Sequence, residues 1–282
     1  MSKGAIIFAQ NSANLDYVKM AVFSAKRLKE HLDIPVSIIT DSSGWLEKGY
    51  PDHVFDQVIS IDNPISTQYK KFNDGTLSSK TLEWKNFTRD TVFNLTPYDK
   101  TLVIDSDYII NSSVLKPAFD LDSNLQIYKK SMDLAPWRSN AEFTRVSQWS
   151  IPFYWATTFI FTKNNIMELF FNLVAYIKAN WTYFRTLYCI TAGAYRNDYA
   201  FSIAIHIMNG KTNGEFATDL PGTMTYSTDK DLLITLENDR LQFLIEKENY
   251  IGQYTLAKTQ GIDVHVMNKH SLCRFIDGGS GV

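Results

Sequence analysis

The sequence predicts an α/β domain with a mostly parallel central sheet flanked by helices. Several short apolar runs are continuous rather than alternating, as in parallel strands that are covered on both faces. A segment with helical periodicity separates the first two runs, and the order strand, helix, strand, strand is typical of nucleotide-binding sheets. The chain has 282 residues, 45% of them hydrophobic, so we expect one large core and a single domain over residues 1–282.

The first elements follow from these patterns in chain order. Residues 5–9 form a short apolar run and are the first predicted strand. Apolar residues recur at helical spacing from Asp16 to Leu32, with lysines on the opposite face, which predicts an amphipathic helix packed on the sheet. Residues 35–40 and 57–61 are the next two predicted strands.

The segment before the following strand also shows helical spacing. Leu82, Arg89 and Phe93 share one face, which predicts a helix over residues 79–95. A turn then leads into a buried strand at residues 101–104, and this strand ends directly at the tripeptide Asp-Ser-Asp.

The rest of the chain begins with a segment that fits neither period. Residues 131–152 are therefore predicted to be a long loop or lid over the site. A strand, two helices and a late strand are predicted next, at residues 153–161, 165–181, 198–208 and 261–267. We expect a nucleotide-binding half at about residues 1–110. A donor-sugar and acceptor half with a helical region is expected at about residues 111–275.

Composition and charge exclude several classes of protein. Lys and Arg total 28 against 30 for Asp and Glu, a formal charge of −2, which gives no overall preference for nucleic acid or an anionic membrane. The apolar run near the N-terminus is too short for a signal peptide or a membrane span, so we expect a cytoplasmic protein. Two cysteines, Cys189 and Cys273, are too few for a disulfide framework.

Asp105 and Asp107 are the strongest candidates for a functional site. They lie just after a buried strand, at the edge where open α/β sheets place their ligands. Two carboxylates on the same side of the pleat can share a divalent cation that also bridges a diphosphate. A pair of solvated turn carboxylates is the alternative, and the apolar strand before them favours the metal site.

Residues 100–110 (KTLVIDSDYII) resemble the metal-binding segment of GT-A fold glycosyltransferases, especially the glycogenin-like family (family 8-like). The resemblance implies a Rossmann-like GT-A fold, a nucleoside-diphosphate sugar donor, and Mn²⁺ or Mg²⁺ as cofactor. By position it also implies a group of donor-binding residues. They are Ala9, Gln10 and Asn11 after the first strand, Asp41 after the second, and Ser106 between the two carboxylates.

Three downstream residues resemble further parts of the family's site. Asp198 matches an acidic residue that opens a helix beside the donor sugar, and it is the candidate base if the enzyme inverts. His265 matches a third metal ligand on a late strand, and its neutral imidazole suits manganese better than magnesium. Lys269 matches a lysine that contacts the diphosphate. The family's lysine lies slightly further along the chain, so His270 is an alternative to His265 as the third metal ligand. A helix cap and a core histidine are the structural alternatives.

Three more residues are candidates for binding the donor. Lys80 and Arg89 lie on the predicted helix before Asp-Ser-Asp, where comparable family helices supply a base to the diphosphate; a solvated basic face is the alternative. Trp155 is a candidate for stacking on a sugar, although aromatic residues in a strand belong to the core more often. It stands where the family has an Asn-Ser-Gly strand, so the identity of the sugar is open.

The sequence therefore predicts a metal-dependent transferase of hexosyl or pentosyl groups to an acceptor hydroxyl, with retention implied by the resemblance. The acceptor is open between a glycan, a protein, a lipid-linked intermediate and a hydroxymethylated pyrimidine in viral DNA, for which Lys70 and Lys71 contribute to a local basic patch. A nucleotidyltransferase is an alternative, although this chain lacks the glycine-rich loop that the class usually has after its first strand. A non-catalytic nucleotide-sugar-binding module is another.

Overall fold

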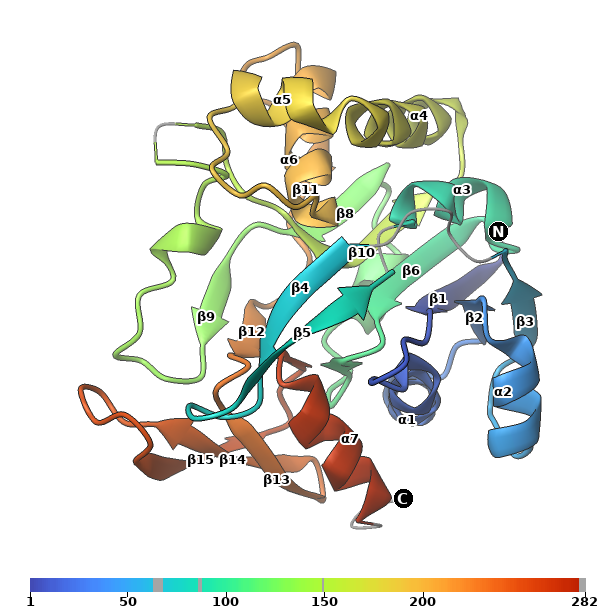
Figure 1. Ribbon diagram of the computed structural model, residues 1–282. Coiled ribbons are helices and arrows are strands. Elements are labelled where there is room, and N and C mark those ends of the chain that lie inside the picture. The colour runs from blue at the N-terminus through green and yellow to red at the C-terminus, as the bar shows by residue number, and fades with distance from the viewer. Residues whose placement is uncertain (63–67, 86–87, 149, 279–282) are drawn as a thin grey trace.

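The computed structural model describes residues 1–62, 68–85, 88–148 and 150–278. Its largest sheet confirms the predicted fold class, α/β with a mostly parallel central sheet flanked by helices (Figure 1). The seven strands lie in the order β11 (Ala217–Thr218), β8 (Leu125–Tyr128), β10 (Trp155–Thr162), β6 (Lys100–Asp105), β1 (Lys3–Ala9), β2 (Val36–Thr40) and β3 (Gln57–Ser60).

The parallel part of this sheet is built from the continuous apolar runs. β6, β1, β2 and β3 are parallel neighbours, and their side chains are buried on both faces through most of β1, β2 and β6. β10 runs antiparallel to β6 and to β8. Because β1 and β6 are parallel, their carboxyl ends lie at the same edge, with Phe8 opposite Asp105.

Helices cover both faces of the sheet. α1 (Tyr17–Leu32) starts after Asp16, whose side chain accepts a hydrogen bond from the Lys19 amide, and it packs on β1 and β2. Figure 1 shows α1, α2 and α7 on one side of the sheet and α4, α5 and α6 on the other. Their bounds are α2 (Ser43–Gly49), α3 (Val92–Leu95), α4 (Asn165–Ala179), α5 (Trp181–Leu187), α6 (Asn197–Met208) and α7 (Lys269–Asp277), with 3₁₀ turns η1 (Arg89–Thr91), η2 (Lys116–Phe119) and η3 (Ala141–Phe143).

Three smaller sheets border the carboxyl edge of the large one. The four-stranded sheet has the order β7 (Tyr108–Ile109), β16 (Val264–Val266), β12 (Met224–Ser227) and β9 (Ser131–Asp133). The antiparallel three-stranded sheet consists of β13 (Leu232–Glu237), β14 (Arg240–Glu246) and β15 (Tyr254–Gln260). The last pair is the hairpin of β4 (Gln68–Asn73) and β5 (Ser79–Trp84).

The prediction of a helix over residues 79–95 is wrong. Its first six residues form β5, the short η1 and α3 follow later, and residues 86–87 lie outside the described residues. Leu82 and Trp84 alternate with more exposed residues, and Gly75 takes a positive φ of 73° in the turn before them. Alternation after an Asp-Gly turn is the pattern of a hairpin, and here it outweighs the helical spacing.

The segment predicted as a lid is mostly irregular, as expected, but it is tied down. Residues 131–148 begin with β9 and contain η3, while residue 149 lies outside the described residues. Arg138 forms two hydrogen bonds with the buried Asp231, at 2.5 and 2.7 Å, and a third with Asp133 at 3.3 Å. This clamp fixes the segment to the start of β13.

Among the helices of the described residues, none combines the length and the apolar character needed to cross a bilayer.

Candidate functional site

The two aspartates are placed by a buried strand of the sheet. Leu102, Val103 and Ile104 of β6 have no exposed surface, and β6 ends at Asp105. The chain then enters β7, which pairs with β16 so that His265 lies opposite Tyr108. The amide of Val266 donates to the carbonyl of Asp107 at 2.9 Å. Strand pairing therefore brings the late strand directly to the aspartates.

Asp105, Asp107 and His265 form a compact group. One possible ligand atom from each lies within 4.8 Å of the other two, and Nε2 of His265 is 3.4 Å from Oδ2 of Asp107. The other ring nitrogen, Nδ1, is buried and has no hydrogen-bond partner among the described residues. Two carboxylate oxygens and an imidazole nitrogen suit Mn²⁺, and Nε2 of His265 is the ring nitrogen that faces Asp107. The residues therefore fit a divalent cation.

Two cations with little exposed surface hold the carboxylates. Lys269, the first residue of α7, donates to Oδ2 of Asp107 at 2.6 Å, and Arg89 forms an ion pair with Asp105. Burial alone would raise the pKa of Asp107, but Lys269 and His265 hold it well below its usual range. Burial lowers the pKa of Arg89 to about 10. Asp107 is therefore a carboxylate throughout the physiological pH range. Lys269 and Arg89 lie where a phosphate group could bind them together with the two aspartates.

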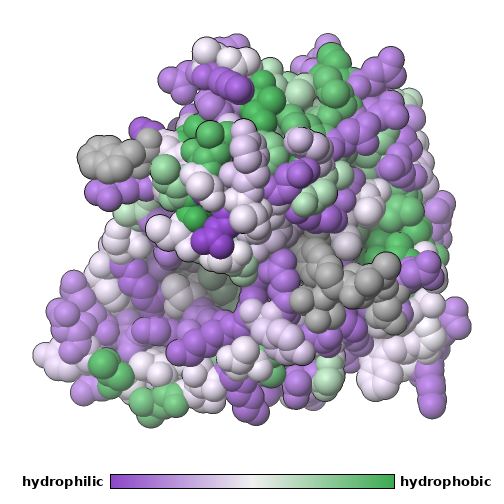
Figure 2. Space-filling view, turned by 45° about the horizontal axis from the view of Figure 1, so that its top comes forward, coloured by the Kyte–Doolittle hydropathy of each residue, from purple (hydrophilic) through white to green (hydrophobic). Residues whose placement is uncertain are grey.

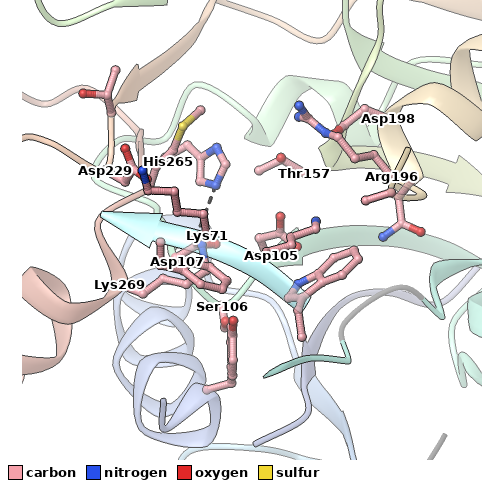
Figure 3. A pocket seen from close by; sticks show the side chains of 18 of the residues that line it. Lys71, Asp105, Ser106, Asp107, Thr157, Arg196, Asp198, Asp229, His265 and Lys269 are labelled. Carbon is pink, nitrogen blue, oxygen red and sulfur yellow. Dashed lines mark hydrogen bonds and ion pairs between the residues drawn. The ribbon is translucent and has the colours of Figure 1, made fainter. Parts of the chain in front are cut away.

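These residues line a cleft of about 600 Å³ at the carboxyl edge of the sheet. Figure 2 shows a hollow in this face, bordered mainly by hydrophilic residues. In the close view, His265, Asp107 and Lys269 gather at one end, and Arg196 and Asp198 lie at the other (Figure 3). Ser106 and Thr157 line the cleft between them.

Asp198 lies in the first turn of α6 with both oxygens engaged. Oδ1 accepts from the Ala156 amide at 2.9 Å, and Oδ2 accepts from two nitrogens of Arg196 at 2.8 and 3.1 Å. The Arg196 guanidinium also lies over the rings of Phe153 and Tyr199, 5.7 and 5.3 Å from their centroids. These contacts fix the Asp198 carboxylate in the cleft wall.

No protein-family model matches this chain. No curated protein sequence matches it either. Among solved structures, the glycosyltransferase GlyE of Streptococcus pneumoniae TIGR4 is similar over 78% of this chain, with 12% identity and a TM-score of 0.43. The similar region is 45% of that GlyE chain, so this chain spans less than half of its length.

The galactosyltransferase LgtC, solved in complex with donor and acceptor sugar analogues, is similar over 76% of this chain and 72% of its own. The identity is 14% and the TM-score 0.46. A structure of an active-site mutant of LgtC gives 13% identity and a TM-score of 0.44. Similarity at this level says nothing about residue roles, so those proposed below rest on this chain's own side chains.

The residues predicted to hold the nucleoside lie beside the cleft, not in its lining. Ala9 and Gln10 are buried at the end of β1. Asn11 accepts from the Val18 amide at 2.9 Å and donates to Asp16 at 3.1 Å, which organises the start of α1. Asp41 follows β2, and its Oδ2 is 3.9 Å from the Lys85 ammonium. Their donor-binding role stays a prediction.

Two further predicted donor-binding residues do not line the cleft either. Lys80 is exposed near the tip of the β4–β5 hairpin, because the helix predicted to carry it together with Arg89 does not form. Trp155 is 1% exposed and packs among Phe143, Tyr226 and the ring of His265, 6.1 Å from the imidazole centroid. Trp155 is a core residue that supports the orientation of His265.

The structure also separates the two candidate histidines. His265 faces Asp107, while His270 lines a different hollow together with Asn11 and Asp16. A second group of possible ligands, Glu30, His31 and Asp239, lies away from the cleft. The Arg27 guanidinium lies 2.5 Å from carboxylate oxygens of both Glu30 and Asp239. The negative charge of this second group is therefore balanced by Arg27 without a metal.

The β4–β5 hairpin is the main part of the site that sequence reasoning missed. Tyr69, Lys70, Lys71, Phe72 and Trp84 line the cleft, and Figure 1 shows the hairpin crossing in front of the sheet. The Asp-Gly turn between two alternating segments was the available signal. Arg196 and Asp229 were also missed, since a single charged residue in a loop carries no local pattern.

Proposed function

We propose that this chain is a metal-dependent glycosyltransferase, which moves a sugar from a nucleoside-diphosphate donor to an acceptor hydroxyl with retention. The observation that carries the proposal is the group of Asp105, Asp107 and His265 with Lys269 at the carboxyl end of a buried parallel strand. Acidic and imidazole ligands next to two basic side chains are what a metal-bound diphosphate requires.

The chemistry follows from these residues. Asp105, Asp107 and His265 would hold Mn²⁺ or Mg²⁺, which acts as a Lewis acid towards the diphosphate. Lys269 and Arg89 bind phosphate oxygens as the donor enters. The bond from the sugar's anomeric carbon to the phosphate oxygen breaks, and its electron pair stays on the diphosphate. The acceptor oxygen forms the new bond to the anomeric carbon, and its proton passes to the departing diphosphate oxygen.

The experiment that tests the proposal is a panel of nucleotide sugars scored for hydrolysis and then for transfer to acceptors. Hydrolysis of one donor is expected in the presence of Mn²⁺, because water replaces the acceptor. EDTA is expected to lower the rate by at least about 100-fold, since the metal supplies several kcal/mol of charge stabilisation. Added Mn²⁺ restores it. Full activity after EDTA and desalting would exclude metal dependence.

Asp198 is the second target. Asp198→Asn preserves the shape of the side chain but removes its charge, so the ion pair with Arg196 is lost. We expect kcat to fall about 100-fold, whether the carboxylate positions a sugar hydroxyl or acts as a base. Asp122→Asn, an exposed aspartate outside the cleft, is the matched control. Unchanged kcat in Asp198→Asn would remove Asp198 from the mechanism.

A further inference from the structure

The inner face of the β4–β5 hairpin presents a lysine to the cleft. Lys70 and Phe72 of β4 share this face with Leu82 and Trp84 of β5, and the three apolar side chains are buried. The Lys70 ammonium lies 3.0 Å from the centroid of the Trp84 ring, and both residues line the cleft that contains Asp105. The aromatic face fixes the position of the charge.

Lys70 differs from three of the other cations around it, and Lys71, which also lines the cleft, is exposed. Arg89, Arg196 and Lys269 each form an ion pair with an aspartate of the cleft. Lys70 has no carboxylate partner among the described residues, and its ammonium instead lies against the Trp84 ring. Burial, and next the charge of Arg196, lowers the pKa of Lys70 well below its usual range. An unbalanced cation in such a place is costly unless an anion joins it.

The surroundings of Lys70 indicate which anion that is. Its ammonium experiences the charges of Arg196 and Asp198 at one end of the cleft, of Lys269 at the other, and of Arg89. Lys70 therefore lies within electrostatic reach of both ends of the cleft that it lines, the aspartate of α6 and the lysine beside the possible metal ligands. A ligand that reaches from Asp198 to the possible metal ligands would bring its negatively charged group close to the Lys70 ammonium.

Contacts near the tip of the hairpin hold the hairpin, and with it Lys70, in place. Asp229 accepts hydrogen bonds from the amide and side chain of Asn73 at 3.0 Å, and the Tyr254 hydroxyl accepts from the Thr76 amide at 2.9 Å. Arg274 forms two contacts of 2.7 Å with Asp74. The hairpin is a strap fastened at its tip, so Lys70 is positioned before any ligand arrives.

We propose that Lys70 binds a phosphoryl oxygen of the donor's diphosphate and stabilises its charge as the nucleoside diphosphate leaves. This inference rests on the proposed function and adds a residue to it. The electron pair of the broken bond stays on a phosphate oxygen, and the Lys70 ammonium is a fixed positive charge beside it. In this role the ammonium acts through its charge and hydrogen bonds.

The test is the binding of inorganic pyrophosphate, measured by titration calorimetry in the presence of Mn²⁺. Lys70→Met is expected to weaken binding about 10- to 100-fold, the effect of losing one charge-assisted hydrogen bond. Lys80→Met is the matched control, since Lys80 is exposed on the same hairpin, and it is expected to stay within about twofold of the wild type. Unchanged pyrophosphate binding in Lys70→Met, or none in the wild type, would overturn the proposal.

Thermal unfolding separates this role from a structural one. Lys70→Met removes an unbalanced charge, so its Tm is expected to equal or exceed that of the wild type while affinity falls. Lys70→Gln serves if the methionine variant does not fold. Pyrophosphate binding that depends on Lys70 in a protein that hydrolyses no nucleotide sugar would leave the anion site standing and refute the function. Donor hydrolysis with a kcat unaffected by Lys70→Met would refute this inference alone.

Discussion

Asp107→Ala is expected to lower the metal-dependent rate by at least about 100-fold and the free energy of unfolding by about 3–5 kcal/mol. The rate falls because a ligand in the proposed metal group is lost. The stability falls because the Lys269 side chain is only 15% exposed, and Asp107 is its only carboxylate within 4.0 Å among the described residues. Denaturation in urea, followed by tryptophan fluorescence, measures the second effect.

A double-mutant cycle tests the origin of the stability loss. Lys269→Met combined with Asp107→Ala leaves no unpaired charge at this position, so the double variant is expected to be more stable than Asp107→Ala alone. Mn²⁺ is expected to raise the Tm of the wild type and not that of either Asp107 variant. An equal Tm shift in all three proteins would place the metal elsewhere.

Asp231→Ala is expected to be the most destabilising change outside the cleft, with a loss of about 3–5 kcal/mol. The Asp231 side chain is fully buried, and it accepts two hydrogen bonds from Arg138 and one from the Thr228 amide at 2.9 Å. Without it the clamp on residues 131–148 opens, and this segment carries Glu142 and Phe143 of the cleft wall.

The same segment provides the control for this prediction. Arg145 is exposed and bonds only the Ser150 carbonyl at 2.7 Å in the described structure, so Arg145→Ala is expected to change stability by less than about 0.5 kcal/mol. Limited proteolysis should cut Asp231→Ala faster within residues 131–148 than either Arg145→Ala or the wild type. Equal cleavage rates would show that the segment is held by its other contacts.

The parts of the fold that were predictable are those with strong local patterns. β1, β2 and β6 are continuous apolar runs and α1 has helical periodicity over its whole length, and their burial follows from these patterns. The aspartates after β6 could be predicted for the same reason, because a buried strand determines where its carboxyl end lies. The joining of His265 to Asp107 followed from the resemblance and not from any local pattern.

The remaining parts depend on contacts between distant residues. Lys80 and Arg89 fit a helical spacing, but pairing of β5 with β4 places Lys80 at an exposed tip. Trp155 was a candidate for sugar stacking because its sequence surroundings do not reveal that Phe143 and Tyr226 cover it. Lys70 looked like part of a surface basic patch until the hairpin turned it inward. The Asp-Gly turn indicates the hairpin, but the contacts that decide where Lys70, Lys80 and Trp155 lie join residues outside any window of neighbours.

The pairing of β7 with β16 has a consequence for how the protein is made. Lys269 and Asp107 are 162 residues apart in the chain, and the strand that carries His265 pairs directly with the two residues after Asp107. A ribosome releases the parallel core of β1, β2 and β6 well before it has synthesised this strand. The aspartates are therefore synthesised long before their histidine and lysine. The group of Asp105, Asp107 and His265 with Lys269 can therefore form only after the chain up to Lys269 has been synthesised.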